Sequence, residues 1–511
     1  MSCVTIACLP FLSPVNPTAL IPIEQCGVTY STYACCIGGG GGGGGIIIAG
    51  AACDSTIRCG VLNQICLSGT SSCSAILGGY ANTVAGYNSF VGGGQANVGG
   101  YYDGYSFNNS FVGGGSNNTS GGCCSSTGGY GLGTNTVVGG FCNRALGAYG
   151  FIGGGLCNIV QCINSAVVGG YYNGVFSENS LVVGGSSNTI NCWSSVVVGG
   201  FYNTSSGSSS SIVGGVYNIV SGGYSFIGGG QFNLSSCDNS FIGGGCCNIA
   251  ASGYASVVGG YYNWACCFYS SVGGGFFNIA TGCGSVVAGG FNNMADTFPY
   301  NAILGGCCNY VYGDNTVNGC NGAGTNLIVA GYKNAILNGA FGVVVGGCQN
   351  TIAGYSLSFI GGGSCNVICK NHSFIGGGDF NIISSGAYNF IGSGFSNTSN
   401  GFMGSVLGGQ SNSSSSGCSV IAGGYFNNVS GGYSSILGGA SNIVSGDLSS
   451  VAGGALNVVS NYKSFVVGSN ITTDRDCTTF VNNLSIKDIP TSAAGLPAGS
   501  VWNNGGVLNI V

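Results

Sequence analysis

Residues Ser240–Ala255 read SFIGGGCCNIAASGYA, and this phrase decides the fold because the chain repeats it with a fixed period. From Asn143 to Asn293 an asparagine returns at every fifteenth residue, without one insertion. Each of these anchor asparagines has Ile or Val six residues before it and Gly-Gly four and three before, and most have a Ser at or near the eighth residue before. The anchors of this register are Asn143, Asn158, Asn173, Asn188, Asn203, Asn218, Asn233, Asn248, Asn263, Asn278 and Asn293.

A short fixed period predicts stacked, near-identical turns of chain. Fifteen residues are too few for a repeat of two helices, but they suit one coil of two short strands and two tight turns. We therefore predict an all-β fold, a parallel β-solenoid or β-roll with coils of about 15 residues. The 24 anchors from Asn82 to Asn457, at about 4.8 Å per coil, would make a stack on the order of 115 Å long.

The repeat divides the chain into three predicted regions. Residues 74–470 form the solenoid shaft, in which the insertions 101–107 and 121–132 should be loops and the register blurs between Gly313 and Gly324. Residues 1–73 lack the repeat, carry nine cysteines, and are predicted to be an attachment or capping region. Residues 471–511 are predicted to be a C-terminal cap, with a hairpin turn at Asn503–Gly506 between two short apolar strands.

The unit SFIGGGQFN, Ser225–Asn233, predicts how one coil is buried. Alternate residues of a strand point to opposite faces, so Ile227 should face one side, and Phe226 and Gly228 the other. Both sides are apolar or small, and strands that are apolar on both sides are typically buried on both. One side is then the narrow interior of the coil. The simplest cover for the other side is another copy of the chain, so we predict a homotrimer with apolar faces between the chains.

The Gly-Gly pair predicts the turn after the first strand, where a positive φ or a close backbone approach excludes a Cβ. The anchor asparagine that follows tolerates left-handed geometry, and its amide can bond to the anchor of the next coil. We predict a structural Asn ladder. The alternative is N-glycosylation, because Asn203, Asn233, Asn397 and Asn412 each begin an Asn-x-Ser/Thr triplet.

Composition argues against several classes of protein. With 105 glycines, 4% charged and 45% hydrophobic residues, the chain matches neither a disordered protein nor collagen. Seven basic against twelve acidic residues leave no patch to neutralise a phosphate backbone, so we expect no nucleic-acid partner. We find no convincing secretory signal and no membrane span. The 29 cysteines indicate an oxidising final environment.

Catalytic chemistry is not indicated. The single histidine, His372, lies at a turn without an evident partner, and the glycine phrases lack the Lys-Ser/Thr of a phosphate-binding loop. The adjacent cysteine pairs have no second C-x-x-C partner for a zinc site. We expect no enzyme activity, no cofactor and no metal. The adjacent pairs are Cys35-Cys36, Cys123-Cys124, Cys246-Cys247, Cys266-Cys267 and Cys307-Cys308.

Cysteines are instead predicted to be covalent staples. Cys142 and Cys157 each precede an anchor in successive coils, and a separation of about 4.8 Å lies within the range that a disulfide accepts. Four other cysteines lie four residues after an anchor but thirty or more residues apart, too far for a direct bridge along one chain: Cys162, Cys192, Cys237 and Cys267. These were expected to pair across the coil, pair with another chain or stay reduced.

Aromatic residues recur just before the anchors and should form a stripe along the axis. The stripe is either packing within the stack or between chains, or a recognition surface that stacks on sugar rings or on a partner. Its candidate residues are Tyr202, Tyr217, Phe232, Tyr262 and Phe277.

The phrase S-x-[IV]-x-G-G-x-x-N, repeated over about four-fifths of the chain, resembles the head repeats of trimeric autotransporter adhesins. The resemblance implies a left-handed parallel β-roll with three chains around a shared core. The sequence departs from that family in lacking a recognisable secretion signal and a C-terminal set of long amphipathic strands. The ending IPTSAAGLPAGSVWNNGGVLNIV, Ile489–Val511, resembles the C-terminal segment of many structural and fibre proteins of bacteriophages and large algal viruses.

These resemblances lead to our main hypothesis, a trimeric fibre on a virion surface that carries host attachment to a glycan or receptor. The alternative is a self-assembling extracellular filament or adhesin, joined end to end through the N-terminal region and the C-terminal cap. An ice-binding solenoid would need a flat Thr ladder, which does not recur.

Overall fold

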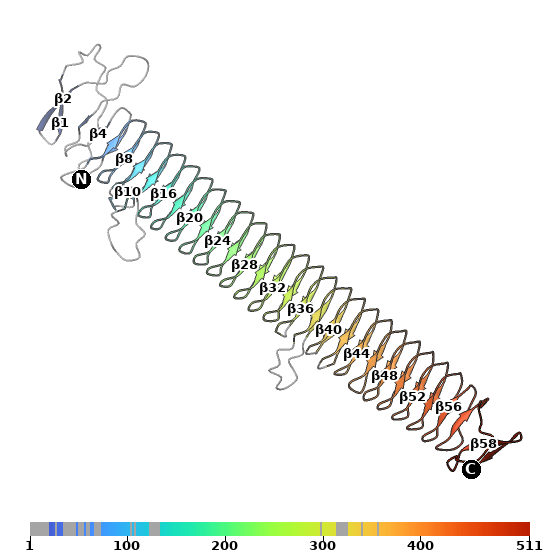
Figure 1. Ribbon diagram of the computed structural model, residues 1–511. Coiled ribbons are helices and arrows are strands. Elements are labelled where there is room, and N and C mark those ends of the chain that lie inside the picture. Colours follow the sequence, from blue (N-terminus) through green and yellow to red (C-terminus); the bar gives the residue numbers. More distant parts are fainter. Residues whose placement is uncertain are drawn as a thin grey trace. The chain divides into compact units, whose positions relative to one another are not determined.

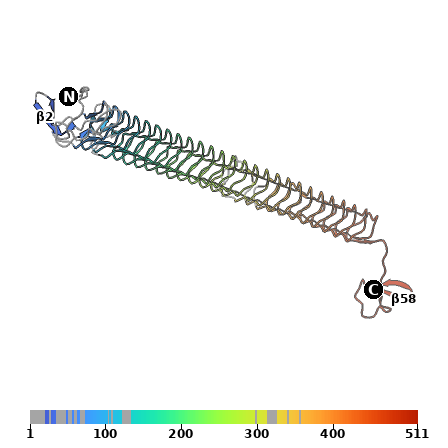
Figure 2. The same cartoon turned by 90° about the horizontal axis from the view of Figure 1, so that it is seen from above.

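The computed structural model describes residues 20–25, 28–33, 48–49, 56–57, 62–65, 73–102, 105–106, 109–121, 133–296, 299–312, 325–338, 341–354 and 357–511. These residues form strands and turns and contain no helix. They build a parallel β-solenoid of about 25 coils, which confirms the predicted fold class. The chain divides into two compact units, Met1–Gly305 and Gly306–Val511. In each unit the coils lie one behind another (Figures 1 and 2).

One coil illustrates the plan of both units. Strand β24 (Ser211–Ile212) belongs to what we call the first sheet, and β25 (Ile219–Val220) to the second sheet. Residues 213–217 form the glycine corner between them, Asn218 is the anchor, and residues 221–224 form the serine corner that leads to the next coil. Ser211 pairs in parallel with Phe226, and Ile219 with Leu234, each fifteen residues further along the chain.

In the unit Met1–Gly305 the parallel strands of the first sheet are β4 (Thr56–Ile57), β6 (Ala75–Ile76), β8 (Phe90–Val91), β12 (Phe111–Val112), β14 (Thr136–Val137), β16 (Phe151–Ile152), β18 (Ala166–Val167), β20 (Leu181–Val182), β22 (Val196–Val197), β24, β26 (Phe226–Ile227), β28 (Phe241–Ile242), β30 (Ser256–Val257), β32 (Ser271–Val272), β34 (Val286–Val287) and β36 (Ala302–Ile303). Those of the second sheet are β5 (Gln64–Ile65), β7 (Thr83–Val84), β9 (Val98–Gly99), β13 (Thr119–Ser120), β15 (Arg144–Ala145), β17 (Ile159–Val160), β19 (Gly174–Val175), β21 (Thr189–Ile190), β23 (Thr204–Ser205), β25, β27 (Leu234–Ser235), β29 (Ile249–Ala250), β31 (Trp264–Ala265), β33 (Ile279–Ala280) and β35 (Met294–Ala295).

In the unit Gly306–Val511 the first sheet contains β38 (Leu327–Ile328), β40 (Val343–Val344), β42 (Phe359–Ile360), β44 (Phe374–Ile375), β46 (Phe390–Ile391), β48 (Ser405–Val406), β50 (Val420–Ile421), β52 (Ser435–Ile436), β54 (Ser450–Val451), β56 (Phe465–Val467) and β57 (Thr479–Val481). The second sheet contains β37 (Tyr310–Tyr312), β39 (Ala335–Leu337), β41 (Thr351–Ile352), β43 (Val367–Ile368), β45 (Ile382–Ile383), β47 (Thr398–Ser399), β49 (Ser413–Ser414), β51 (Asn428–Val429), β53 (Ile443–Val444) and β55 (Val458–Val459).

Among the described residues four antiparallel pairings lie outside this plan. Strand β1 (Leu20–Gln25) pairs with β2 (Val28–Tyr33), and β3 (Ile48–Ala49) pairs with β4. The insertion after Asn97 contains the pair β10 (Tyr101–Tyr102) and β11 (Tyr105–Ser106). The expected C-terminal hairpin is formed by β58 (Val501–Asn504) and β59 (Val507–Ile510). The expected loop 121–132, apart from Gly121, and the segment 313–324 lie outside the described residues.

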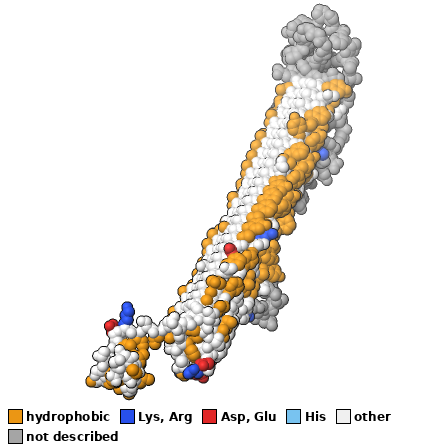
Figure 3. All heavy atoms as spheres, turned by 90° about the vertical axis from the view of Figure 1, so that its right-hand side faces the viewer, with side chains coloured by type: hydrophobic (Ala, Val, Ile, Leu, Met, Phe, Trp, Pro, Cys, Tyr) orange, Lys and Arg blue, Asp and Glu red, His pale blue; other side chains and the backbone are white. Residues whose placement is uncertain are grey.

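The core of the solenoid is narrow. Each regular coil contributes one inward residue from each sheet, and Ile212 and Val220 illustrate this with 0% exposure. Ile227 is also 0% exposed, as the alternation predicted, whereas Phe241 of the next coil faces outward and is 40% exposed. The outer faces therefore display large apolar side chains, which gather in a strip along the stacked coils on the face shown in Figure 3.

All lengthening of the repeat occurs at the serine corner. Five residues separate β25 from β26, but six separate β41 from β42, where the anchors are sixteen apart. The longer insertions also fall there, between β9 and β12 and between β13 and β14. From the inward residue of the first sheet to the anchor the count stays constant in the regular coils. The glycine corner thus has a fixed length, and its contacts explain why.

Candidate functional site

Within each unit the anchor asparagines lie inside the coil and form a ladder, illustrated by Asn218. Its side-chain Nδ2 donates to the carbonyl oxygen of Gly214 at 3.0 Å within its own coil and to that of Gly230 at 2.9 Å in the next coil. Its Oδ1 accepts a hydrogen bond from the backbone N–H of Asn233 at 3.1 Å. Asn218 is 0% exposed. Each rung therefore satisfies buried backbone groups of its own coil and of the next.

The left-handed residue is not the anchor, which corrects the expectation that the asparagine adopts this geometry. The positive φ belongs to the residue just before it, such as Tyr217 with φ 54° and Cys157 with φ 54°. The turn places the anchor side chain inside, where its amide can bond to neighbouring coils. Non-glycine residues tolerate this region at some cost, and the buried amide bonds offset that cost.

The two glycines of the corner have different roles. Gly215 has a φ of +91°, and a Cβ built on it would lie 2.1 Å from the carbonyl oxygen of Gly230 and 2.5 Å from Nδ2 of Asn218. A Cβ on Gly214 would meet nothing within 4 Å. The second glycine is therefore required by the close approach of successive coils, as predicted, whereas Gly214 serves through its carbonyl oxygen.

A second buried ladder runs along the serine corner and was not predicted. Ser225 Oγ donates to the carbonyl oxygen of Cys237 at 2.8 Å and accepts from the backbone N–H of Ser240 at 3.1 Å. At three of the positions where Asn replaces this serine the next coil has a glycine, as at Asn389, where the N–H of Gly404 donates to the asparagine Oδ1 at 3.0 Å. The recurrence of Ser and the pairs Asn135/Gly150, Asn326/Gly342 and Asn389/Gly404 were the available sequence signals.

Burial decides against glycosylation of the ladder. Asn203 and Asn397 are 0% exposed, and Asn233 and Asn412 are 1% exposed. Their Nδ2 groups donate to buried carbonyl oxygens, as for Asn203 to that of Gly215 at 2.9 Å. The folded chain therefore does not present these amides to a glycosyl-transferring enzyme.

The predicted aromatic stripe is a stack of rings. Tyr202 and Tyr217 have ring centroids 5.0 Å apart and planes inclined by 4°, and Tyr217 and Phe232 are 5.2 Å apart at the same inclination. Tyr262 stacks on Phe277 at 5.1 Å. Stacked rings cover one another's faces and leave mainly edges outward, whereas sugars stack on exposed faces. This geometry favours packing within the stack, and recognition by the stripe stays a prediction.

The ring stack is interrupted at Cys247, between Phe232 and Tyr262. An open apolar groove of about 280 Å³ lies there on the outer face of the second sheet. Besides those three residues, its lining includes Tyr217, Ile219, Leu234 and Trp264.

No family model and no curated protein matches this chain. The groove and the ladders must therefore be interpreted from their own chemistry.

Cys142 and Cys157 lie side by side in successive coils, where the structure has them as thiols. Burial, together with the neighbouring Cys157 thiol, raises the pKa of Cys142. The bridge between them stays a prediction. One disulfide is present among the described residues, Cys267–Cys283, with Cα atoms 4.9 Å apart. The conclusion that Cys267 is too far from a partner along the chain was wrong, because it compared only equivalent positions, and Cys283 lies one position further in the next coil.

We expect oxidised protein, digested without reduction, to contain both a Cys267–Cys283 and a Cys142–Cys157 peptide when analysed by mass spectrometry. The reason is that each pair lies at disulfide distance in adjacent coils. Until it is oxidised, Cys142 should react slowly with alkylating agents at neutral pH, because its raised pKa keeps the thiol protonated. Complete alkylation of all 29 thiols in the native assembly without reductant would contradict both bridges.

Two of the predicted adjacent cysteine pairs are in contact and have a left-handed second residue, Cys247 and Cys308, whereas Cys267 of the pair Cys266-Cys267 is bonded to Cys283. The sulfur atoms of Cys246 and Cys247 are 3.2 Å apart, and those of Cys307 and Cys308 are 3.1 Å apart. Among the described residues no group of three or more His, Cys, Asp or Glu side chains could hold a metal ion.

The single histidine, His372, stacks on Tyr388, with ring centroids 4.8 Å apart. The part of the chain that the structure describes has no helix able to cross a membrane. The other predicted cysteine pairs, Cys35-Cys36 and Cys123-Cys124, lie outside the described residues.

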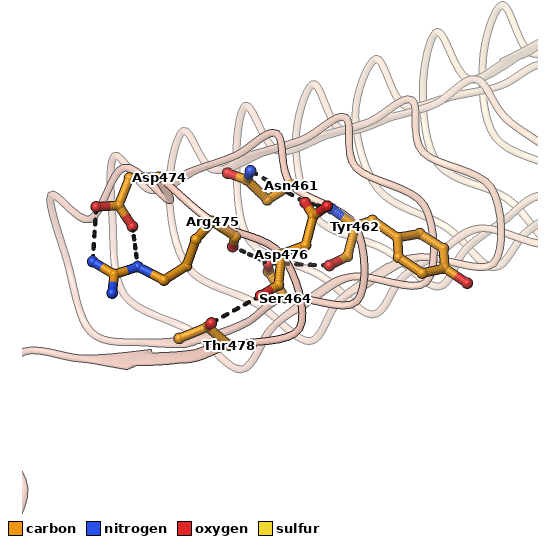
Figure 4. Close-up of polar contacts among 7 residues, drawn as sticks. All are labelled: Asn461, Tyr462, Ser464, Asp474, Arg475, Asp476 and Thr478. Atoms are coloured by element: carbon orange, nitrogen blue, oxygen red, sulfur yellow. Dashed lines mark hydrogen bonds and ion pairs between the residues drawn. The ribbon is translucent and has the colours of Figure 1, made fainter.

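The charged cluster after residue 470 ends the serine ladder (Figure 4). Asp476 Oδ1 accepts from the backbone N–H of Tyr462 at 2.9 Å and from Asn461 Nδ2 at 3.2 Å, and Ser464 Oγ donates to the carbonyl oxygen of Arg475 at 3.1 Å. The exposed Arg475 guanidinium bonds to Asp474 and holds the pKa of that carboxyl below its ordinary value. The segment thus takes the place of a further coil at this corner.

Proposed function

We propose that this chain is the structural fibre protein of a virion, assembled as a homotrimer that carries host attachment. The observation that carries the proposal is the pair of buried ladders, which bonds each coil to the next through side chains as well as backbone. A solenoid held this way is a stiff spacer, because each repeat contacts its neighbours along one axis. Such a spacer suits the task of holding an attachment site away from a particle.

The outer faces support association of chains. A core of about two inward side chains per coil is narrow, while Val198 and Leu437 are 43% and 59% exposed on the first sheet. Large exposed apolar surfaces mark interaction sites. The virion surface and the glycan or receptor partner rest on the ending Ile489–Val511, which resembles viral fibre proteins.

The second candidate is an extracellular filament of chains joined end to end. Asp476 accepts from the N–H of Tyr462 as Asp238 accepts from that of Gly223 within the shaft, so the segment after residue 470 continues the stacking of the coils, and end-to-end joining stays the alternative.

We expect purified protein to have three times the chain mass by light scattering and to form discrete rods in negative-stain images. Antibodies against it should label the surface of the virus particles. A single-chain mass would overturn the homotrimer, and threads of indefinite length would favour the filament. Particles that carry none of the protein would overturn the virion assignment.

A further inference from the structure

The outer face of the first sheet differs in composition from all other surfaces of the coils. Its outward residues lie seven and five positions before each anchor, as Ser211 and Val213 do for Asn218. Across the described coils these positions carry Phe, Val, Leu, Ala, Gly, Ser or Thr, and none carries a charged or amide side chain. The outward position of the second sheet, in contrast, includes Arg144 and Asn428. A solvated sheet face would normally carry charges.

The two outward positions also complement each other in volume. In eight coils the first of these positions is Phe and the second is Gly. In each of them the Phe ring lies 3.3–3.5 Å from the place that a Cβ on the glycine would take. The pairs are Phe90/Gly92, Phe111/Gly113, Phe151/Gly153, Phe226/Gly228, Phe241/Gly243, Phe359/Gly361, Phe374/Gly376 and Phe390/Gly392. Each ring thus covers the glycine of its own strand and keeps the face apolar.

Coils without the ring fill the same place from the other position. Thr136 is followed by Val138, Ser211 by Val213, and Ser435 by Leu437. The exceptions are Ser271/Gly273 and Ser450/Ala452, with no large side chain, and Phe465/Val467, with two. A Cβ on the eight glycines would also lie 2.2–2.3 Å from a carbonyl oxygen of the next coil, as it would on Gly273, which has no ring beside it. Neither contact explains Val213 and Leu437, which are 45% and 59% exposed. A sheet face that stays free of charged and amide side chains from coil to coil is one that packs against a regular partner.

We infer that this face is covered by the equivalent face of other copies of this chain, with the chains parallel and their coils in axial register. A partner that contacts one residue pair per coil, at about 4.8 Å intervals, needs the same repeat, and this chain has it. Rows of stacked rings, such as Phe359, Phe374 and Phe390 at 5.1 and 5.3 Å, can then meet identical rows. The inference rests on the proposed homotrimer and specifies the face that forms it.

The test compares two variants of the same coil, one with a lysine on the outer face of the first sheet and one with a lysine on the outer face of the second sheet. Val198→Lys and Leu407→Lys alter the first sheet, and Thr204→Lys and Ser413→Lys are their matched controls on the second. We expect the first pair to shift the light-scattering mass toward a single chain, or to raise the concentration needed for assembly at least about tenfold, because a buried charge is costly. The controls should assemble as the unsubstituted chain does.

Each outcome separates the inference from the homotrimer. If Thr204→Lys and Ser413→Lys dissociated the assembly and the first pair did not, the assignment of the face would be overturned, whereas the proposal of a homotrimer would stand. Equal effects of both pairs would overturn it as well. A single-chain mass of the unsubstituted protein would overturn both proposals.

A second measurement applies if the lysine variants do not fold. Leu437→Cys places a thiol on the first sheet, and Ile443→Cys places one on the second sheet of the same coil. In parallel chains in register, equivalent residues near the common axis meet, so oxidation by molecular oxygen should link the Leu437→Cys peptide to its own copy. Mass spectrometry should find no such self-link for Ile443→Cys. A self-link at Ile443→Cys alone would contradict the inference.

Discussion

Gly215→Ala should prevent the coils around it from stacking and should destabilise the fold by about 4 kcal/mol or more, a loss typical of severe backbone conflicts. Its Cβ would lie 2.1 Å from the carbonyl oxygen of Gly230, and backbone atoms cannot move away without breaking the hydrogen bonds of the corner. Its φ of +91° is also unfavourable for alanine. The change in unfolding free energy can be measured with denaturant and circular dichroism.

The neighbouring glycine provides the matched control. Gly214→Ala adds the same methyl group where nothing lies within 4 Å, so its stability should stay within about 1 kcal/mol of the unsubstituted chain. Similar losses for both substitutions would show that close approach of the coils is not what excludes the side chain.

Asn218→Leu should be the second most damaging change, at about 3–5 kcal/mol. Leucine is similar in size but leaves the carbonyl oxygen of Gly214 and the N–H of Asn233 without their buried partner, and it removes one of the two bonds to the carbonyl oxygen of Gly230. Each unsatisfied buried group costs about 1–3 kcal/mol. The midpoint of unfolding should fall, and hydrogen exchange should rise first at Asn233.

Asn191→Leu is the control for this prediction. Asn191 is exposed in the serine corner, where its side-chain Nδ2 donates to the Ser206 hydroxyl at 3.3 Å. Its loss should cost no more than about 0.5 kcal/mol, as is usual for surface substitutions. If Asn218→Leu were equally mild, the ladder would not be a major source of stability.

The repeat period made the architecture predictable because two residues in each coil recur with little variation. Ile227 could be placed inside by alternation alone, and Gly215 at a close approach by the rule that glycine marks missing space. The bonding of Asn218 to its neighbours followed from the register. In a fold whose units are identical, correct reasoning about one coil applies to the rest.

Other features depended on three-dimensional detail that a period does not contain. Tyr217 rather than Asn218 has the left-handed φ, and tyrosine gives no composition signal for it. The Cys267–Cys283 bridge joins unequal positions of adjacent coils, so a comparison of equal positions missed it. The serine ladder was visible as a recurring residue, but its bonds depend on how the corner turns.

The confinement of extra residues to the serine corner has a consequence for how the length of this protein can evolve. The glycine corner has the same number of residues in every regular coil. The serine corner, in contrast, accepts a sixteenth residue or a longer insertion, and the strands of both sheets still pair in register. A solenoid is a linear stack in which each coil contacts only its neighbours. If one whole coil is duplicated or deleted, the remaining coils therefore contact their neighbours as before. Gene segments encoding single coils are therefore interchangeable units of length, and recombination between them can lengthen or shorten the shaft in equal steps.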